Sequence, residues 1–100
     1  MKHANLDDVR NVRVVGARCA NQETLHAYLA RKLDFPEHYG ANLAALADCL
    51  SEICVPTRIT IAINEHDIDP GMQAYVIRFV QTCAREALVN ENLSLVIEHY

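Results

Sequence analysis

The side chains of this sequence that could do chemistry gather between residues 33 and 54, with Asp48 among them. Helical spacing predicts a short helix from about Asn42 to Ile53, with its leucines on one buried stripe. Asp48 falls on the opposite face, among alanines and Ser51. A fixed carboxylate on such a smooth face could dock a basic group of another molecule. The pattern also fits a plain solvated face, because alanine is the best helix former and exposed charges are common on helices.

His38 and Cys49 lie near Asp48 in the sequence, which raises the possibility of acid–base or thiol chemistry. Cys49, however, falls at the edge of the buried stripe, and Asp48 points away from it. The sequence contains no Gly-rich phosphate loop, no H-E-x-x-H zinc motif and no nucleophile elbow. We therefore expect a protein that is not an enzyme and has no catalytic residues.

The four cysteines and five histidines show no spacing that would gather metal ligands. No cysteine belongs to a C-x-x-C pair, so the usual zinc and redox signatures are absent. We expect reduced and mostly buried thiols, and neither a metal nor another cofactor. Surface or half-buried positions are expected for the histidines other than His38, which are His3, His26, His66 and His99.

The length of 100 residues and the apolar half of the composition fit one domain, residues 1–100, with a core that needs no staples. The net charge of −4 supplies no basic stripe for phosphates, which argues against direct contact with nucleic acid. It favours a basic protein partner, although a mild negative charge also simply keeps a small protein soluble. The sequence shows no signal segment and no membrane span, so we expect a cytoplasmic protein.

The spacing of apolar residues predicts the order strand, helix, helix, strand, helix, strand. The strands are expected at 12–19, 57–64 and 93–98, and the helices at 21–33, 42–53 and 70–88. Pro36 and Gly40 shape the loop between the first two helices, because Pro36 redirects the chain and Gly40 can take a positive φ that other residues resist. The strand 57–64 is small or apolar on both faces, as in strands covered on both sides or nearly so. We predict an α/β fold, a small three-stranded parallel sheet with helices packed against it.

Residues 36–50, Pro-Glu-His-Tyr-Gly-Ala-Asn-Leu-Ala-Ala-Leu-Ala-Asp-Cys-Leu, resemble the signature segment of barstar-family ribonuclease inhibitors. The family pattern is close to Pro-Glu-Tyr-Tyr-Gly-x-Asn-Leu-Asp-x-Leu-Trp-Asp-Cys-Leu, and the order of elements agrees from Val12 to Glu98. The resemblance implies a barstar-like fold and binding to a secreted, barnase-like ribonuclease before export. In the family, the loop and central helix enter the enzyme cleft, and the carboxylate matching Asp48 lies where a substrate phosphate would bind. Such a cleft presents converging cations, which a carboxylate satisfies through charge-assisted hydrogen bonds.

The resemblance also implies a partner-binding surface made by the loop, the central helix and one residue of the last helix. Its residues are His38, Tyr39, Gly40, Asn42, Leu43, Ala44, Ala47, Asp48, Ser51 and Gln73. Four of them depart from the family: His38 replaces a tyrosine, Ala44 an aspartate, Ala47 a tryptophan and Gln73 a glutamate. Each lost hot-spot contact costs about 2 kcal/mol or more, so we expect barnase-type enzymes to be bound much more weakly than by the archetype.

These observations predict an intracellular inhibitor of a secreted barnase-like ribonuclease, which plugs the active-site cleft with the 37–52 loop and helix. The alternative is an immunity or regulatory module that binds a different, non-barnase partner through the same surface, because fold does not fix function. We expect a secreted ribonuclease or related basic toxin as partner, no nucleic acid or membrane, and a monomer when free. His38, at a partner-facing position, predicts binding that depends on pH between about 5 and 8.

Overall fold

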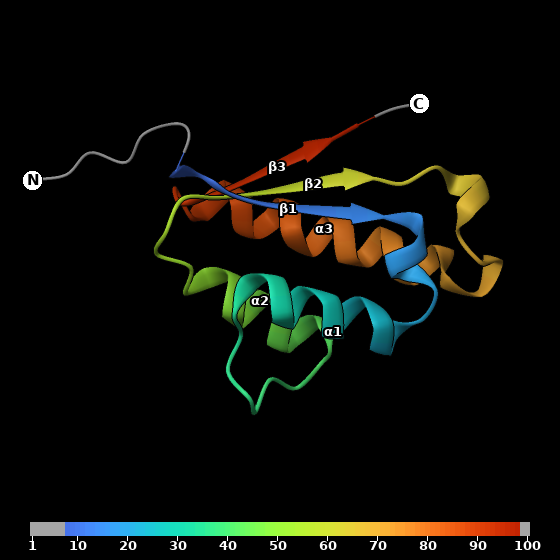
Figure 1. The fold of residues 1–100 in the computed structure, drawn as a ribbon, viewed down its shortest axis with the longest axis horizontal. Helices are drawn as coiled ribbons and strands as arrows, with labels where there is room; N and C mark the ends of the chain where they lie inside the picture. The colour runs from blue at the N-terminus through green and yellow to red at the C-terminus, as the bar shows by residue number, and fades with distance from the viewer. Residues whose placement is uncertain (1–7, 99–100) are drawn as a thin grey trace, which may run out of the picture.

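A single parallel sheet forms one side of the molecule, at the top of Figure 1, in the computed structural model, which describes residues 8–98. Strand β1 (Arg10–Val15) pairs with β2 (Thr57–Ala62), and β2 pairs with β3 (Leu93–Ile97), in the order β1-β2-β3. The register places Val12 opposite Ile59 and Ile59 opposite Leu95. The predicted α/β fold with three parallel strands is therefore confirmed, with shorter strands than the sequence suggested.

Three helices lie on one side of this sheet: α1 (Gln22–Leu33), α2 (Leu43–Ser51) and α3 (Gln73–Val89) (Figure 1). Helices α1 and α3 contact the strands, and α2 packs mainly against α3. The opposite face of β2 has no helix over it in this view, and there Arg58 is exposed and Thr60 is half-buried. The expected covering of β2 on both faces is thus met only in part. All three helices lie on the side of the sheet that also carries the loop before α2.

The core lies between the sheet and the helices. Its largest fully buried side chains come from every layer; they include Leu25 and Leu29 of α1, Leu46 and Leu50 of α2, Ile59 of β2 and Phe79 of α3. The leucines of α2 follow the helical spacing that the sequence predicts, so this helix presents one apolar stripe inward and its polar residues outward. Burial of that stripe orients Asp48 toward solvent.

Local signals set the ends of these elements. Asn21 and Asn42 cap α1 and α2, since the side-chain oxygen of each accepts a hydrogen bond from the backbone N–H three residues later, at 2.8 Å. Asp69 caps a short 3₁₀ turn, Pro70–Met72, that leads directly into α3. Two further 3₁₀ turns, Gly16–Cys19 and Glu65–Asp67, follow β1 and β2.

Gly40 does not adopt the positive φ that is open to glycine; the neighbouring Ala41 takes that conformation, with φ 53°. Gly40 is instead needed for space: a Cβ there would lie 3.3 Å from the Cβ of Ala45 and 3.3 Å from the Asn42 side chain. The loop therefore lies tightly against the first turn of α2, and its shape depends on both residues.

No helix in the part of the chain that the structure describes is long and apolar enough to cross a membrane.

Candidate functional site

The carboxylate of Asp48 stands exposed on the outer face of α2. It forms no salt bridge with any residue between 8 and 98 in this structure. A hollow of about 260 Å³ adjoins it, and the residues around this hollow come from the loop and from α2: Pro36, His38, Tyr39, Gly40, Ala45, Asp48, Cys49 and Glu52. The group that sequence analysis placed at the centre of the site is thus free to meet a partner.

A second carboxylate, that of Glu52, lies one helical turn beyond Asp48 and lines the same hollow. Like charges four residues apart on a helix repel each other, and anions near the C-terminal end of a helix oppose its dipole. Helix α2 carries no basic residue in its last turn that would offset either effect. The two carboxylates are therefore unfavourable for the stability of α2. A cation of another molecule would relieve their repulsion.

Most of the sequence-predicted binding residues lie on this one surface. Exposed positions belong to His38, Gly40, Asn42, Ala44, Asp48 and Ser51, and half-buried ones to Tyr39, Leu43 and Ala47. Gln73 is also exposed, but it begins α3, whereas the other end of α3 meets the end of α2 through Asn90. At 1.5 Å per residue, Gln73 lies about 25 Å along α3 from Asn90. Gln73 therefore lies far from the C-terminal end of α2, at the end of α3 whose Tyr75 is linked through His26 to Tyr39 of the loop.

The phenol of Tyr39 points inward and holds the loop to the body of the protein. Its hydroxyl bonds to Nδ1 of His26 at 2.5 Å, and Nε2 of His26 bonds to the hydroxyl of Tyr75 on α3 at 2.6 Å. The Tyr39 ring also packs against Phe35, with ring centroids 4.8 Å apart. One side chain of α1 thus connects the binding loop to α3, and Tyr39 serves as an anchor as well as a surface residue.

Burial makes this His26 link an uncharged one. His26 is only 1% exposed, and desolvation lowers its pKa below the ordinary value. Burial is also the main cause that raises the pKa of Tyr39 and of Tyr75. A neutral imidazole has one donor and one acceptor nitrogen, so one phenol donates to His26 and the other accepts from it.

The expectation of a surface or half-buried position is wrong for His26. The sequence did carry a signal, since His26 stands three and seven residues before the buried Leu29 and Leu33. Tyr75 was missed for a similar reason, although its spacing of four from Phe79 matches the buried stripe of α3. His66 is exposed as expected, and His3 and His99 lie outside the described residues.

The cysteines form no disulfide in this structure. All four are free thiols; Cys19 and Cys83 are buried, Cys49 is half-buried and Cys54 is exposed, so the expectation of mostly buried thiols holds for two of them. Burial is the main cause that raises the pKa of Cys49, and the carboxylates of Glu52 and Asp48 add to it, which disfavours the thiolate. No group of three potential metal ligands occurs among residues 8–98.

Comparison with known proteins identifies the family of this chain. Residues 9–92 match the family described as barstar (barnase inhibitor), whose members are inhibitors and not enzymes. The chain is also similar to a Bacillus subtilis (strain 168) protein named "Putative ribonuclease inhibitor YrdF", with 49% identity over 43 residues. That match covers 43% of this chain and 47% of the relative, so the chain spans about half the length of the curated relative it matches. Because the family match extends over most of the sequence, including the loop, α2 and the sheet, the chain belongs to the barstar family of barnase inhibitors.

Proposed function

We propose that this protein inhibits a secreted barnase-like ribonuclease in the cytoplasm, by inserting the 37–52 loop and helix into the enzyme's active-site cleft. The observation that carries the proposal is the carboxylate of Asp48, which is exposed on a fixed helix face and forms no salt bridge with the residues that the structure describes. A ribonuclease cleft binds phosphate and must therefore present cations, and a preorganised carboxylate satisfies them at little ordering cost. Family membership and the similarity to a protein named as a ribonuclease inhibitor support the same conclusion.

Binding on this model is steric as well as electrostatic. The Asn42 cap fixes the start of α2, and the link from Tyr39 through His26 to Tyr75 fixes the loop. Small side chains at Ala44 and Ala47 leave the face around Asp48 low, so that a cleft wall can approach it closely. A rigid surface of this kind loses little conformational entropy on binding.

The first test measures inhibition of barnase and other small secreted ribonucleases by the purified chain, and compares Asp48→Ala with the unaltered protein. Loss of one central charged contact should weaken inhibition by about 30-fold or more. The melting temperature should stay the same or rise slightly, because the substitution removes an unfavourable charge from the end of α2. Asp67→Ala, which removes an exposed carboxylate from the turn after β2, is the matched control and should inhibit normally.

Full inhibition by Asp48→Ala would contradict this assignment of the binding surface. The alternative function, an immunity or regulatory module for a different partner, is favoured by the alanines at positions 44 and 47, which replace two family contacts. It predicts that no barnase-like enzyme is inhibited, while a non-ribonuclease protein from the native host is retained by the unaltered chain and released by Asp48→Ala.

A further inference from the structure

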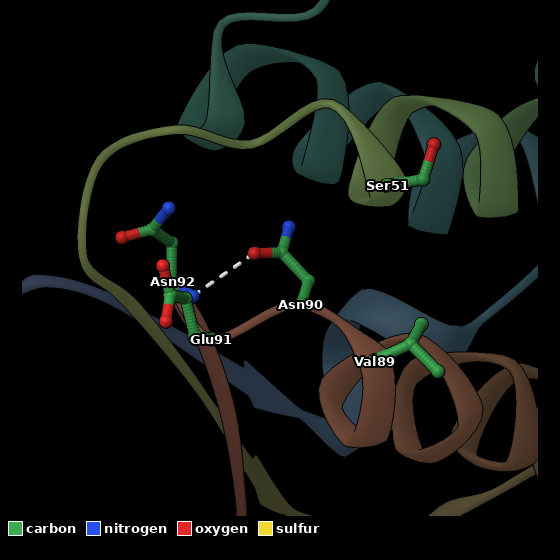
Figure 2. Close-up of a pocket in the computed structure, with 5 residues that line it drawn as sticks. All are labelled: Ser51, Val89, Asn90, Glu91 and Asn92. Atoms are coloured by element: carbon green, nitrogen blue, oxygen red, sulfur yellow. Dashed lines mark hydrogen bonds between the residues drawn. The ribbon is translucent and has the colours of Figure 1, made fainter.

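A second hollow, of about 480 Å³, lies where α2 and α3 both end. Figure 2 shows Ser51 at the end of α2 on one side and Val89 at the end of α3 on the other, with the turn before β3 between them. The residues that line it are Ser51, Val89, Asn90, Glu91 and Asn92. Ser51 stands three residues after Asp48 on α2, so this hollow continues the proposed binding surface around the end of the helix.

The floor of the hollow is fixed by the side chain of Asn90. Its Nδ2 donates to the carbonyls of Leu50 at 2.9 Å and Ile53 at 3.0 Å, and its Oδ1 accepts from the backbone N–H of Asn92 at 2.9 Å (Figure 2). These bonds join the end of α2 to the turn before β3. The hollow therefore keeps its shape without help from a partner.

The electrostatics of this place favour a cation. Two helices direct their C-terminal, partially negative ends here, and neither carries a basic residue in its last turn. Helix α1, in contrast, ends with Arg31 and Lys32 in its last turn. The exposed carboxylate of Glu91 adds a full negative charge, and no Lys or Arg is among the residues that line the hollow.

Apolar surface at the rim suits the stem of a long basic side chain. Val89, which lines the hollow, is 77% exposed, and its neighbour in the chain, Leu88, is 87% exposed; these are the two highest values among the large apolar residues that the structure describes. Lysine and arginine commonly lay their methylene groups along such surface while the charged head reaches a polar group.

We propose that this hollow receives a lysine or arginine side chain of the same ribonuclease that binds Asp48, with Glu91 and the ends of α2 and α3 as its counter-charge. The inference rests on the proposed function and adds a second anionic contact to it. The resemblance placed a second partner-facing residue at Gln73, but the charge pattern of the structure assigns that role to the opposite end of α3. The partner must then present two cationic groups, one for Asp48 and one for this hollow.

The test uses the ribonuclease that the unaltered chain inhibits most strongly, from a panel that includes barnase. Glu91→Lys should lower the affinity about tenfold, because it reverses the charge that meets the partner's cation. Asp67→Lys makes the same change of charge in the turn after β2, at the opposite end of the parallel sheet, and should change the affinity less than about twofold. A double-mutant cycle between Glu91→Gln and alanine substitutions of the enzyme's Lys and Arg residues should give coupling for one of them.

Val89→Lys separates binding from folding. The new ammonium group complements both helix ends, so the melting temperature should rise by about 2–4 °C. The same group occupies the hollow and repels the partner's cation, so the affinity should fall about tenfold. Stability and affinity should thus move in opposite directions, which a purely structural role of this turn would not produce.

The outcomes distinguish the two proposals. If the unaltered chain inhibits no ribonuclease of the panel, the proposed function fails and the hollow loses its occupant with it. If the unaltered chain inhibits an enzyme but Glu91→Lys and Val89→Lys bind it as tightly as Asp67→Lys does, only the second contact is overturned.

Discussion

At the scale of single residues, the binding loop contains a backbone conformation that its side chain disfavours. Ala41, directly before the Asn42 cap, has φ 53°, in the left-handed region that glycine adopts without cost. For an L-residue with a Cβ this conformation costs about 1 kcal/mol or more. Strain of this kind persists only where surrounding contacts impose it, and it is concentrated at binding sites. The location of Ala41 beside the predicted partner surface agrees with that rule.

Ala41→Gly should therefore raise the free energy of unfolding by about 0.5–1 kcal/mol, the relief of left-handed strain less the entropy that glycine adds to the unfolded chain. Urea denaturation followed by circular dichroism measures the change. Ala44→Gly, three residues later in the exposed face of α2, is the matched control and should lower the free energy of unfolding by about 1 kcal/mol. A destabilised Ala41→Gly protein would show that the loop conformation is not strained.

At the scale of elements, α1 controls the loop through one buried imidazole. His26 is in contact with the phenols of Tyr39 and Tyr75, and the residues that the structure describes place no carboxylate within hydrogen-bond distance of it. A proton on His26 would have to be accommodated in this buried position without a counter-charge, and both phenols would have to accept hydrogen bonds at once. Acid should therefore loosen the connection between the loop and α3.

The sign of the expected pH dependence follows from the lowered pKa of His26. Below about pH 6.5 the unfolded chain takes up the proton before the folded one, so the free energy of unfolding falls on acidification, by at most about 1.4 kcal/mol per pH unit. Urea denaturation at pH 7.5 and 5.5 measures the loss. His26→Gln, which cannot be protonated, should remove most of it, whereas His66→Gln at an exposed position should not. If the His26→Gln protein loses as much free energy of unfolding between pH 7.5 and 5.5, protonation of His26 is not the cause of the loss.

The sequence predicted elements better than it predicted contacts between them. The starts of α1 and α2 and the inward stripe of α2 are local patterns, and they emerged close to where they were expected. The His26 link, the positive φ at Ala41 and the Asn90 bridge join segments or depend on how a loop lies against a helix. No spacing along the chain encodes such contacts. The prediction of a binding surface came from the family resemblance of residues 36–50, not from periodicity.

At the scale of the whole molecule, the separation of charge governs how a partner approaches. The net charge is −4, and the exposed carboxylates of Asp48, Glu52 and Glu91 lie on or beside α2 and the end of α3. Exposed basic residues also lie on the helical side, at the end of α1 and along α3, but α2 itself carries no Lys or Arg. A basic enzyme should therefore be drawn to the surface of α2, and complementary potentials of this kind raise association rates.

The association rate constant with a basic ribonuclease should fall about tenfold or more between 50 and 500 mM salt, while the dissociation rate constant changes much less. Stopped-flow fluorescence measures both. Arg58→Glu makes the molecule more negative without touching the binding face, and should change the association rate constant less than Asp48→Asn does. If Arg58→Glu has the larger effect, overall charge and not its placement directs the encounter.

The inward direction of the Tyr39 phenol has a consequence for how this scaffold can diversify. The loop is held by the buried bond between Tyr39 and His26, and residues 38, 44 and 47, which point outward, take no part in that bond. Substitutions at these outward positions can therefore follow changes in an opposing enzyme, while the conformation of the loop beneath them is kept. The same fold can in this way present binding surfaces for different enzymes.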